Sequence, residues 1–194
     1  METIILRDRV TNRMSDEEFL WFCQENKDLR IERNSKLEII LMTPVTTKSG
    51  LQNGAIFGQL YAWNLRSKAG EVFDSSTGFT LPDRSILSPD ASWIANEKFA
   101  ALSDEEKDRF AAICPDFVIE LRSKSDSLVE LQNKMISWIK NGVELAWLID
   151  TKGQTSYIYR SKSPDVETIQ GFNAKLIGEG LMDGFILDLS LIKL

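Results

Sequence analysis

The sequence contains no histidine and only two cysteines, Cys23 and Cys114. The absence of histidine excludes Ser-His-Asp and Cys-His catalysis, typical zinc sites and the usual general base near neutral pH. Two isolated thiols do not make a disulfide framework, so we expect a protein of the reducing cytoplasm. Any hydrolytic chemistry must therefore use carboxylates, lysine, hydroxyl groups or a hard metal ion.

Long apolar segments are also missing. No apolar run approaches the roughly 18 residues that a membrane span needs, and the N-terminus lacks the pattern of a secretory signal. We therefore expect no membrane association. The 194 residues contain no internal repeat, low-complexity tract or linker rich in Pro and Gly. This organisation predicts a single domain, with residues 1–30 as an N-terminal helical extension and residues 31–194 as the core.

The charge balance is acidic, with 23 Lys and Arg against 29 Asp and Glu and a net charge of −6. Such a balance counts against a protein that coats nucleic acid by charge alone. It leaves open an enzyme that grips DNA through a local basic patch.

Capping boxes mark the predicted helices. Ser15 with Glu18, Ser103 with Glu106 and Ser127 with Glu130 each precede a helical segment, and another helix is predicted from about 50 to 68. Strands are predicted at 29–44 (two strands around a turn), 71–81, 86–95, 116–121, 143–150 and 155–160, with the apolar tail 181–192 packed on the core. Because helices and strands alternate, we predict an α/β fold, a mixed sheet flanked by helices.

Glu120 is the first candidate site residue. It lies inside an apolar strand, where alternation places Val118 and Glu120 on one face and Phe117, Ile119 and Leu121 on the other. A buried carboxylate without a partner costs several kcal/mol, so Glu120 needs a cation, a hydrogen-bond network or a metal ion. A structural ion pair, or a strand with one wet face, is the alternative.

Asp90 and Lys134 complete a possible set. Asp90 follows a proline at the start of a predicted strand, where it could also be only a turn residue or cap. Lys134 lies about 40° from Trp138 on the helical wheel, at the flank of the apolar stripe of its helix. Its side chain could extend past the core into solvent, or could point at the Glu120 strand. Gln132 flanks the other side of that stripe as a weaker candidate.

Together the three residues form a recognisable chemistry. Two carboxylates from neighbouring strands can hold Mg²⁺ or Mn²⁺ through oxygen ligands. A nearby lysine can orient or deprotonate the attacking water and stabilise charge on the phosphorus centre. The three residues are therefore candidates for a metal site, but spacing alone is a weak signal because many α/β domains offer an Asp, a Glu and a Lys in this order.

Several segments together resemble the Uma2-like proteins. These are VFDSSTGFTLPDRSILSPDASWI, CPDFVIELRSKSDSLVELQNKM, NGVELAWLID and DGFILDLS, and the likeness covers nearly the whole chain from Ile31 onward. That family, formerly a domain of unknown function and abundant in cyanobacteria, is assigned to the PD-(D/E)XK nuclease superfamily. The resemblance implies a restriction-endonuclease-like core, with Asp90 and Glu120 as metal ligands.

The chain departs from the superfamily pattern at two places. The usual lysine lies two residues after the glutamate, which is Arg122 here, so the resemblance implies that the basic role moves to Lys134. The superfamily often adds an acid from an early helix, and the matching segment LQNGAIFGQL has none. Glu32 is the nearest substitute. Ser123 could fix the end of the Glu120 strand or start a turn, and Arg122 could contact phosphate.

These observations predict a Mg²⁺- or Mn²⁺-dependent endonuclease that hydrolyses DNA. The alternative is a nuclease fold without catalysis that serves as a binding or assembly module, a possibility raised by the missing acid and the acidic net charge. By analogy with nucleases of this fold, which often pair to address two strands, we expect a homodimer.

Overall fold

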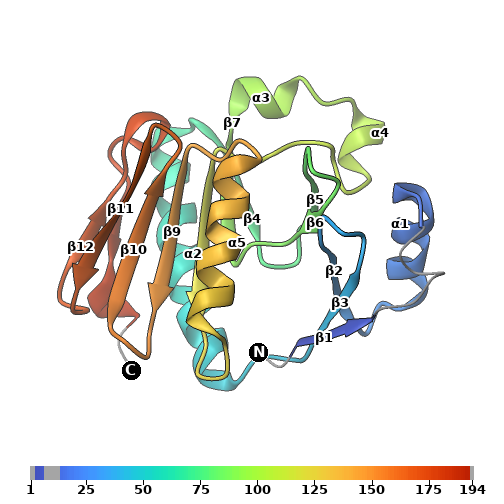
Figure 1. Cartoon of the computed structure of the whole chain (residues 1–194). Helices are drawn as coiled ribbons and strands as arrows, with labels where there is room; N and C mark the ends of the chain where they lie inside the picture. Colours follow the sequence, from blue (N-terminus) through green and yellow to red (C-terminus); the bar gives the residue numbers. More distant parts are fainter. Residues whose placement is uncertain (1–2, 7–13, 193–194) are drawn as a thin grey trace.

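The computed structural model describes residues 3–6 and 14–192, which form two large sheets, a hairpin and flanking helices (Figure 1). The five-stranded sheet has the order β1 (Thr3–Leu6), β3 (Ile39–Met42), β2 (Arg30–Arg33), β6 (Ile86–Leu87), β5 (Phe79–Thr80). The six-stranded sheet has the order β11 (Ser163–Gln170), β10 (Thr155–Arg160), β9 (Leu145–Asp150), β8 (Phe117–Arg122), β7 (Ala91–Ala95), β4 (Gly70–Asp74).

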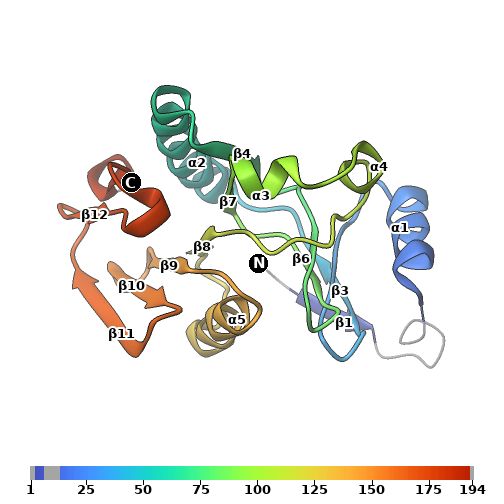
Figure 2. The same ribbon diagram turned by 90° about the horizontal axis from the view of Figure 1, so that it is seen from above.

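The six-stranded sheet is mixed, as the sequence predicts. Its central strands β8 and β9 run parallel, and the other neighbours are antiparallel. The helices are α1 (Asp16–Glu25), α2 (Thr47–Ser67), α3 (Asn96–Ala100), α4 (Asp104–Lys107) and α5 (Leu128–Lys140). Viewed from above, α2 and α5 lie on opposite faces of this sheet, while α1 lies against the five-stranded sheet (Figure 2).

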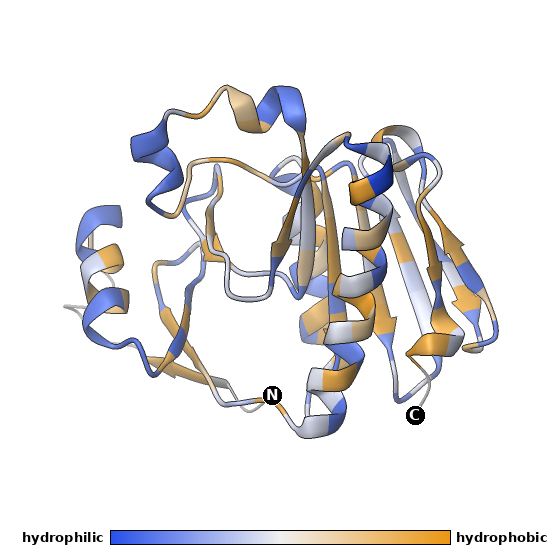
Figure 3. Ribbon diagram, turned by 180° about the vertical axis from the view of Figure 1, so that it is seen from behind, coloured by the Kyte–Doolittle hydropathy of each residue, from blue (hydrophilic) through white to orange (hydrophobic). Residues whose placement is uncertain are grey.

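The strand alternation predicted around Glu120 is confirmed by the two apolar clusters that cover the sheet. Phe117, Ile119 and Leu121 of β8 pack with the apolar face of α2. On the other face, Val118 packs with Met135 and Trp138 of α5. Hydrophobic residues accordingly follow the central strands, while the helices carry both hydrophilic and hydrophobic residues (Figure 3). Glu120 therefore emerges on the α5 side, between apolar neighbours.

Two predicted strands are wrong as single units, because the chain crosses between the sheets within each of them. Residues 71–81 contain all but the first residue of β4 in the six-stranded sheet and then β5 in the five-stranded sheet. Residues 86–95 likewise divide into β6 and β7. The second break falls at Pro89, which has no backbone N–H to donate to a ladder. Asp90 consequently stands at the junction of the two sheets.

The helix predictions hold with smaller corrections. α2 starts at Thr47, before the predicted residue 50, because Thr46 caps it by accepting from the Ser49 N–H. Ser15 and Ser103 form complete capping boxes with Glu18 and Glu106. At α5 only half of the predicted box is recorded, in which Ser127 accepts from the Glu130 N–H.

The two ends of the chain add strands that the sequence analysis does not contain. Residues 1–30 contribute the expected helix α1, but also β1, which pairs with β3, and residues 7–13 lie outside the described ranges. Beyond β10, residues 163–170 form β11. The tail packs on the core as predicted, through β12 (Lys175–Ile177), η2 (Gly180–Met182), β13 (Ile186–Asp188) and η3 (Leu189–Leu191). No helix in the described ranges is long and apolar enough to span a bilayer.

Candidate active site

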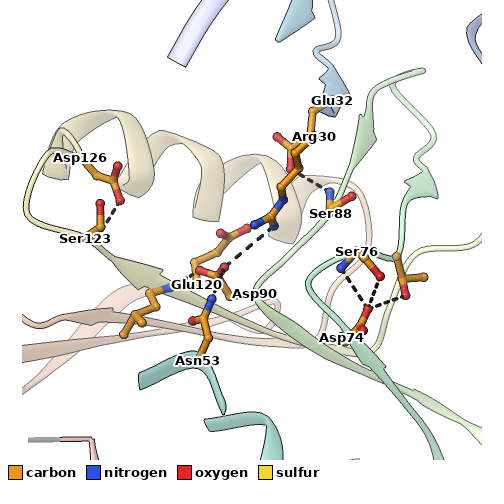
Figure 4. A network of polar contacts seen from close by, with 12 residues as sticks. Arg30, Glu32, Asn53, Asp74, Ser76, Ser88, Asp90, Glu120, Ser123 and Asp126 are labelled. Carbon is orange, nitrogen blue, oxygen red and sulfur yellow. Dashed lines mark hydrogen bonds and ion pairs between the residues drawn. The ribbon is translucent and has the colours of Figure 1, made fainter. Parts of the chain in front are cut away.

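The candidate site lies where the two sheets meet, between α2 and α5. Asp90 stands directly before β7, Glu120 belongs to β8, and Lys134 comes from the middle of α5. Glu32 of β2 and Asn53 of α2 reach the same place from the five-stranded sheet and from the opposite face (Figure 4). Residues far apart in the sequence thus converge at one point of the fold.

Glu120 is buried, with 4% of its surface exposed. Its Oε1 lies 3.0 Å from the Lys134 ammonium nitrogen and accepts a 2.9 Å hydrogen bond from the Trp138 indole N–H. The pKa of Glu120 is raised to about 7, mainly by burial and also by the neighbouring charges of Asp90 and Glu32, while Lys134 opposes the shift. All recorded polar contacts use Oε1, so within the described residues Oε2 has no hydrogen-bond partner.

Lys134 bridges two carboxylates. Its Nζ lies 3.2 Å from Glu32 Oε1 and 3.0 Å from Glu120 Oε1. Burial by itself would lower the pKa of Lys134, but the negative charges of Glu120 and Glu32 outweigh burial and raise the pKa above its usual value. The side chain therefore carries a proton at neutral pH, and in this state it is a cation rather than a general base.

Asp90 is fixed by contacts to both of its oxygens. Oδ2 accepts a 2.8 Å hydrogen bond from the Leu121 N–H, which ties Asp90 to the strand that carries Glu120. Oδ1 accepts a 3.1 Å hydrogen bond from the Asn53 amide, and the Arg30 guanidinium lies 4.0 Å away. Figure 4 shows Arg30 and Asn53 approaching this carboxylate from opposite sides. Asp90 is thus more than a turn residue, because it links the two sheets and α2.

Glu32 lies beside the lysine. It is 4% exposed, and the same Oε1 that contacts Lys134 accepts a 2.9 Å hydrogen bond from the Ser88 N–H. The carboxylate therefore joins the site from β2, and not from the early helix where the superfamily pattern often has an acid. Its position next to Lys134 explains how one lysine is held between two strands of different sheets.

Asn53 is the site residue that the sequence analysis misses. Its amide nitrogen holds Asp90, while its Oδ1 is buried with no hydrogen-bond partner among the described residues. A buried carbonyl oxygen without a partner costs about 1–3 kcal/mol, unless another group satisfies it. Asn53 lies in the segment LQNGAIFGQL, which contains no acid, and this amide is its polar contribution to the site.

The remaining predicted residues do not join the cluster. Arg122 Nη1 pairs with Asp150 Oδ2 at 2.9 Å, so this guanidinium is engaged at the end of the sheet and leaves the basic position to Lys134. The Ser123 N–H donates to Asp126 Oδ2, which starts the turn before α5. Gln132 is half-buried on α5, and no hydrogen bond to Asp90, Glu120 or Lys134 is recorded for it in the described part of the chain.

Asp90 and Glu120 fit a hard divalent cation that takes only part of its ligands from the protein. No group of three or more Asp, Glu or Cys side chains in the described ranges could hold a metal ion by itself. Mg²⁺, however, is usually held by one or two carboxylates and completes its shell with water and substrate phosphate. Asp90 and Glu120 supply that minimum, and the raised pKa of Glu120 and the orphaned Asn53 oxygen both indicate a site that a cation would stabilise.

The mixed sheet with helices on both faces has the restriction-endonuclease-like fold. A crystal structure at 1.96 Å, described as a "putative nuclease belonging to DUF820" from Anabaena variabilis ATCC 29413, matches this fold with a TM-score of 0.70 and 19% sequence identity. The match covers 84% of this chain and 88% of that chain.

The family follows from the sequence match. The model of the Uma2 family, described as "Putative restriction endonuclease", matches residues 16–190, so the chain belongs to the Uma2 family. A comparison with curated proteins gives no match. The family and fold predicted from the sequence are thereby confirmed.

Proposed function

We propose that this protein is a Mg²⁺- or Mn²⁺-dependent endonuclease that hydrolyses phosphodiester bonds in DNA. The observation that carries the proposal is the Asp90, Glu120 and Lys134 cluster, in which Glu120 pairs with a protonated lysine and Asp90 is tied to the strand that carries Glu120. Family membership supports nuclease activity, and the chemistry of the donor set supports the choice of metal.

Asp90 and Glu120 are the proposed metal ligands. The Leu121 N–H orients Asp90, and the Trp138 N–H and Lys134 hold Glu120 by one oxygen, which leaves Oε2 for the cation. A divalent ion bound there would polarise the scissile phosphate and lower the pKa of a water molecule. The surrounding apolar residues of α5 keep bulk water away from this face of β8 and so strengthen the electrostatic interactions.

Lys134 acts in this proposal as an electrostatic partner of the phosphate. Because the pKa of Lys134 is raised, the ammonium stays protonated and cannot take a proton from water in the observed arrangement. It can instead stabilise the negative charge that develops on phosphate oxygens, a contribution typically worth about 3 kcal/mol. Of the two roles the sequence left open for the lysine, charge stabilisation is the one that its environment favours.

Lys134→Met tests this role. The variant keeps the length of the side chain and the helix propensity but removes the charge, so DNA nicking should fall about 10²-fold or more, while Mn²⁺ binding measured by calorimetry at pH 8 is retained. Lys140→Met, at the other end of the same helix, is the matched control and should nick like the wild type. Equal nicking by the two variants would contradict the role of Lys134.

The rival proposal is a nuclease fold that binds without cleaving. It is favoured by the direct contact between Glu120 and Lys134, since an ion pair can satisfy a buried carboxylate without any metal. The two proposals differ in metal binding: an inactive module would show neither calorimetric Mn²⁺ binding nor metal-dependent nicking. A cytoplasmic homodimer is the further part of our proposal, and sedimentation analysis would test the dimer.

A further inference from the structure

A cavity with a basic lining lies beside the candidate site. Its volume is about 840 Å³, and it lies between the start of α2, the turn after β8 and the turn after β9. Three lysines line it, Lys48, Lys124 and Lys152, together with the hydroxyl-bearing residues Thr46 and Ser49. None of the described residues that line this cavity is acidic.

The local charge is opposite to that of the whole protein. The chain has a net charge of −6, so a concave surface with three lysines and no lining carboxylate is a marked exception. Two acids outside the lining are bonded to lining residues: Asp150, which accepts from the Lys152 N–H, is neutralised by its pair with Arg122, and Asp126 accepts from the Ser123 N–H. The three lysines therefore outnumber the carboxylates around the cavity. The cavity therefore presents a positive potential to an approaching ligand.

The helix that borders the cavity adds to this potential. α2 has 21 residues, and its N-terminal turn, capped by Thr46, lies at the wall of the cavity. The N-terminal end of a helix carries a partial positive charge and attracts anions such as phosphate. Hydroxyl groups, lysine ammonium groups and a helix N-terminus are the donors that recur in contacts to nucleic-acid backbones.

Two elements, β8 with its following turn and α2, contribute residues both to the cavity and to the candidate site. Ser123 at its wall follows Glu120 by three residues, which at about 3.3 Å per residue is a distance of roughly 10 Å along the chain. Gln52, also at the wall, directly precedes Asn53, the residue that holds Asp90. A separation of this size corresponds to a few nucleotides of one DNA strand.

We infer that this lysine-lined cavity binds the phosphodiester backbone of duplex DNA next to the bond that is cut. The inference rests on the proposed function, because it takes the Asp90 and Glu120 cluster as the cleavage site. Lys124 and Lys152 contact phosphates in this arrangement and position the strand, and they read no base sequence. They are positioning residues and touch none of the reacting atoms.

The test is the affinity of the full-length protein for a fluorescent 20-base-pair duplex, measured by anisotropy with EDTA so that no cleavage occurs. Lys124→Gln/Lys152→Gln should weaken binding about tenfold or more, and should reduce the slope of log affinity against log salt by about 0.9 for each lost phosphate contact. Lys140→Gln/Lys162→Gln removes two exposed lysines at the opposite end of the six-stranded sheet and is the matched control.

The outcomes separate this inference from the proposed function. Weaker binding with a smaller salt slope in the cavity variant alone supports the inference, even if no preparation cleaves DNA. Equal effects of the two double variants, or no binding of the duplex by the wild type at low salt, overturns it, even if Mn²⁺-dependent nicking is observed. A circular dichroism spectrum unchanged from the wild type shows that each variant is folded.

Discussion

Two buried ion pairs lie at the end of the parallel strands β8 and β9, and they differ in what they leave unsatisfied. Asp150 uses Oδ2 for Arg122 and Oδ1 for the N–H groups of Lys152 and Gly153, so both oxygens have partners. Glu120 uses only Oε1, for Lys134 and Trp138. Both oxygens of Asp150 are therefore satisfied within the protein, whereas Oε2 of Glu120 remains available to bind a cation.

The surroundings of the two pairs differ in the same sense. Arg122 faces one carboxylate and also donates to the Asp126 carbonyl. Lys134 faces Glu120 and Glu32, and Asp90 stands close enough to raise the pKa of Glu120. An excess of negative charge in a buried place costs free energy unless a cation neutralises it. Similar residue types thus build a structural pair two residues away from a candidate metal site.

Glu120→Gln should abolish most of the nuclease activity, whereas the matched substitution in the other ion pair should not. The amide keeps the shape of the side chain but removes the charge that binds the metal, which is worth several kcal/mol of transition-state stabilisation, or about 10³-fold in rate. Plasmid nicking with Mg²⁺ or Mn²⁺ measures the effect. Asp150→Asn is the matched substitution in the pair with Arg122 and should keep its specific activity at a temperature where it is folded.

Asp150→Asn should lower the free energy of unfolding more than Glu120→Gln does. It leaves the Arg122 guanidinium, which is 13% exposed, beside an amide that cannot balance its charge, and should lower the free energy of unfolding by about 3 kcal/mol. Urea denaturation measures this value. A loss of stability in Glu120→Gln as large as that in Asp150→Asn would mean that both pairs are structural.

The affinity for metal should depend on pH, because Glu120 must lose its proton to bind a cation. Because burial raises the pKa of Glu120 to about 7, a proton competes with the metal below that pH and no longer competes above it. The affinity for Mn²⁺ should therefore rise about tenfold per pH unit up to about pH 7 and then level off. Calorimetry between pH 5.5 and 8.5 is the measurement, and an affinity that is constant over this range would refute the assignment of Glu120.

Asn53→Asp should produce the smallest effect. The new carboxylate would face Asp90 Oδ1, where the amide nitrogen now lies at 3.1 Å, and would add a charged oxygen ligand to the site. Mn²⁺ affinity should rise about threefold to tenfold, since ligand charge tunes the affinity of oxygen sites. The metal-free variant should be less stable because of repulsion with Asp90. Asn53→Leu, which removes both polar atoms, should weaken binding and serves as the control.

The sequence predicts the central part of this fold and leaves the junction of the sheets unpredicted. Strand alternation is a local rule, so the sequence places Val118 and Glu120 on one face of their strand. Helical periodicity is local too and places Lys134 at the flank of the apolar stripe, but it leaves open whether the side chain meets Glu120. The break at Pro89, by contrast, sends one apolar segment into two sheets, and which strands pair depends on tertiary contacts. Asn53 was missed for the same reason, since nothing local shows that an amide in α2 faces Asp90.

The roles of Arg122 and Glu32 illustrate the same limit. Both residues lie in short polar stretches whose sequence is compatible with a phosphate contact, an ion pair or a solvated surface. Only the register of Arg122 opposite Asp150 on β9, and the approach of β2 to α5, assign each to its partner. Local patterns therefore identify candidate residues, and the pairing of strands decides which of them meet.

Calorimetric titration of Mn²⁺ at pH 8 into the wild type, Glu120→Gln and Asp150→Asn tests the central claim most directly. We predict binding by the wild type and Asp150→Asn, and a loss of binding in Glu120→Gln with an unchanged circular dichroism spectrum. Equal Mn²⁺ affinity in the wild type and Glu120→Gln, or no binding by the wild type, would contradict a metal site at Asp90 and Glu120.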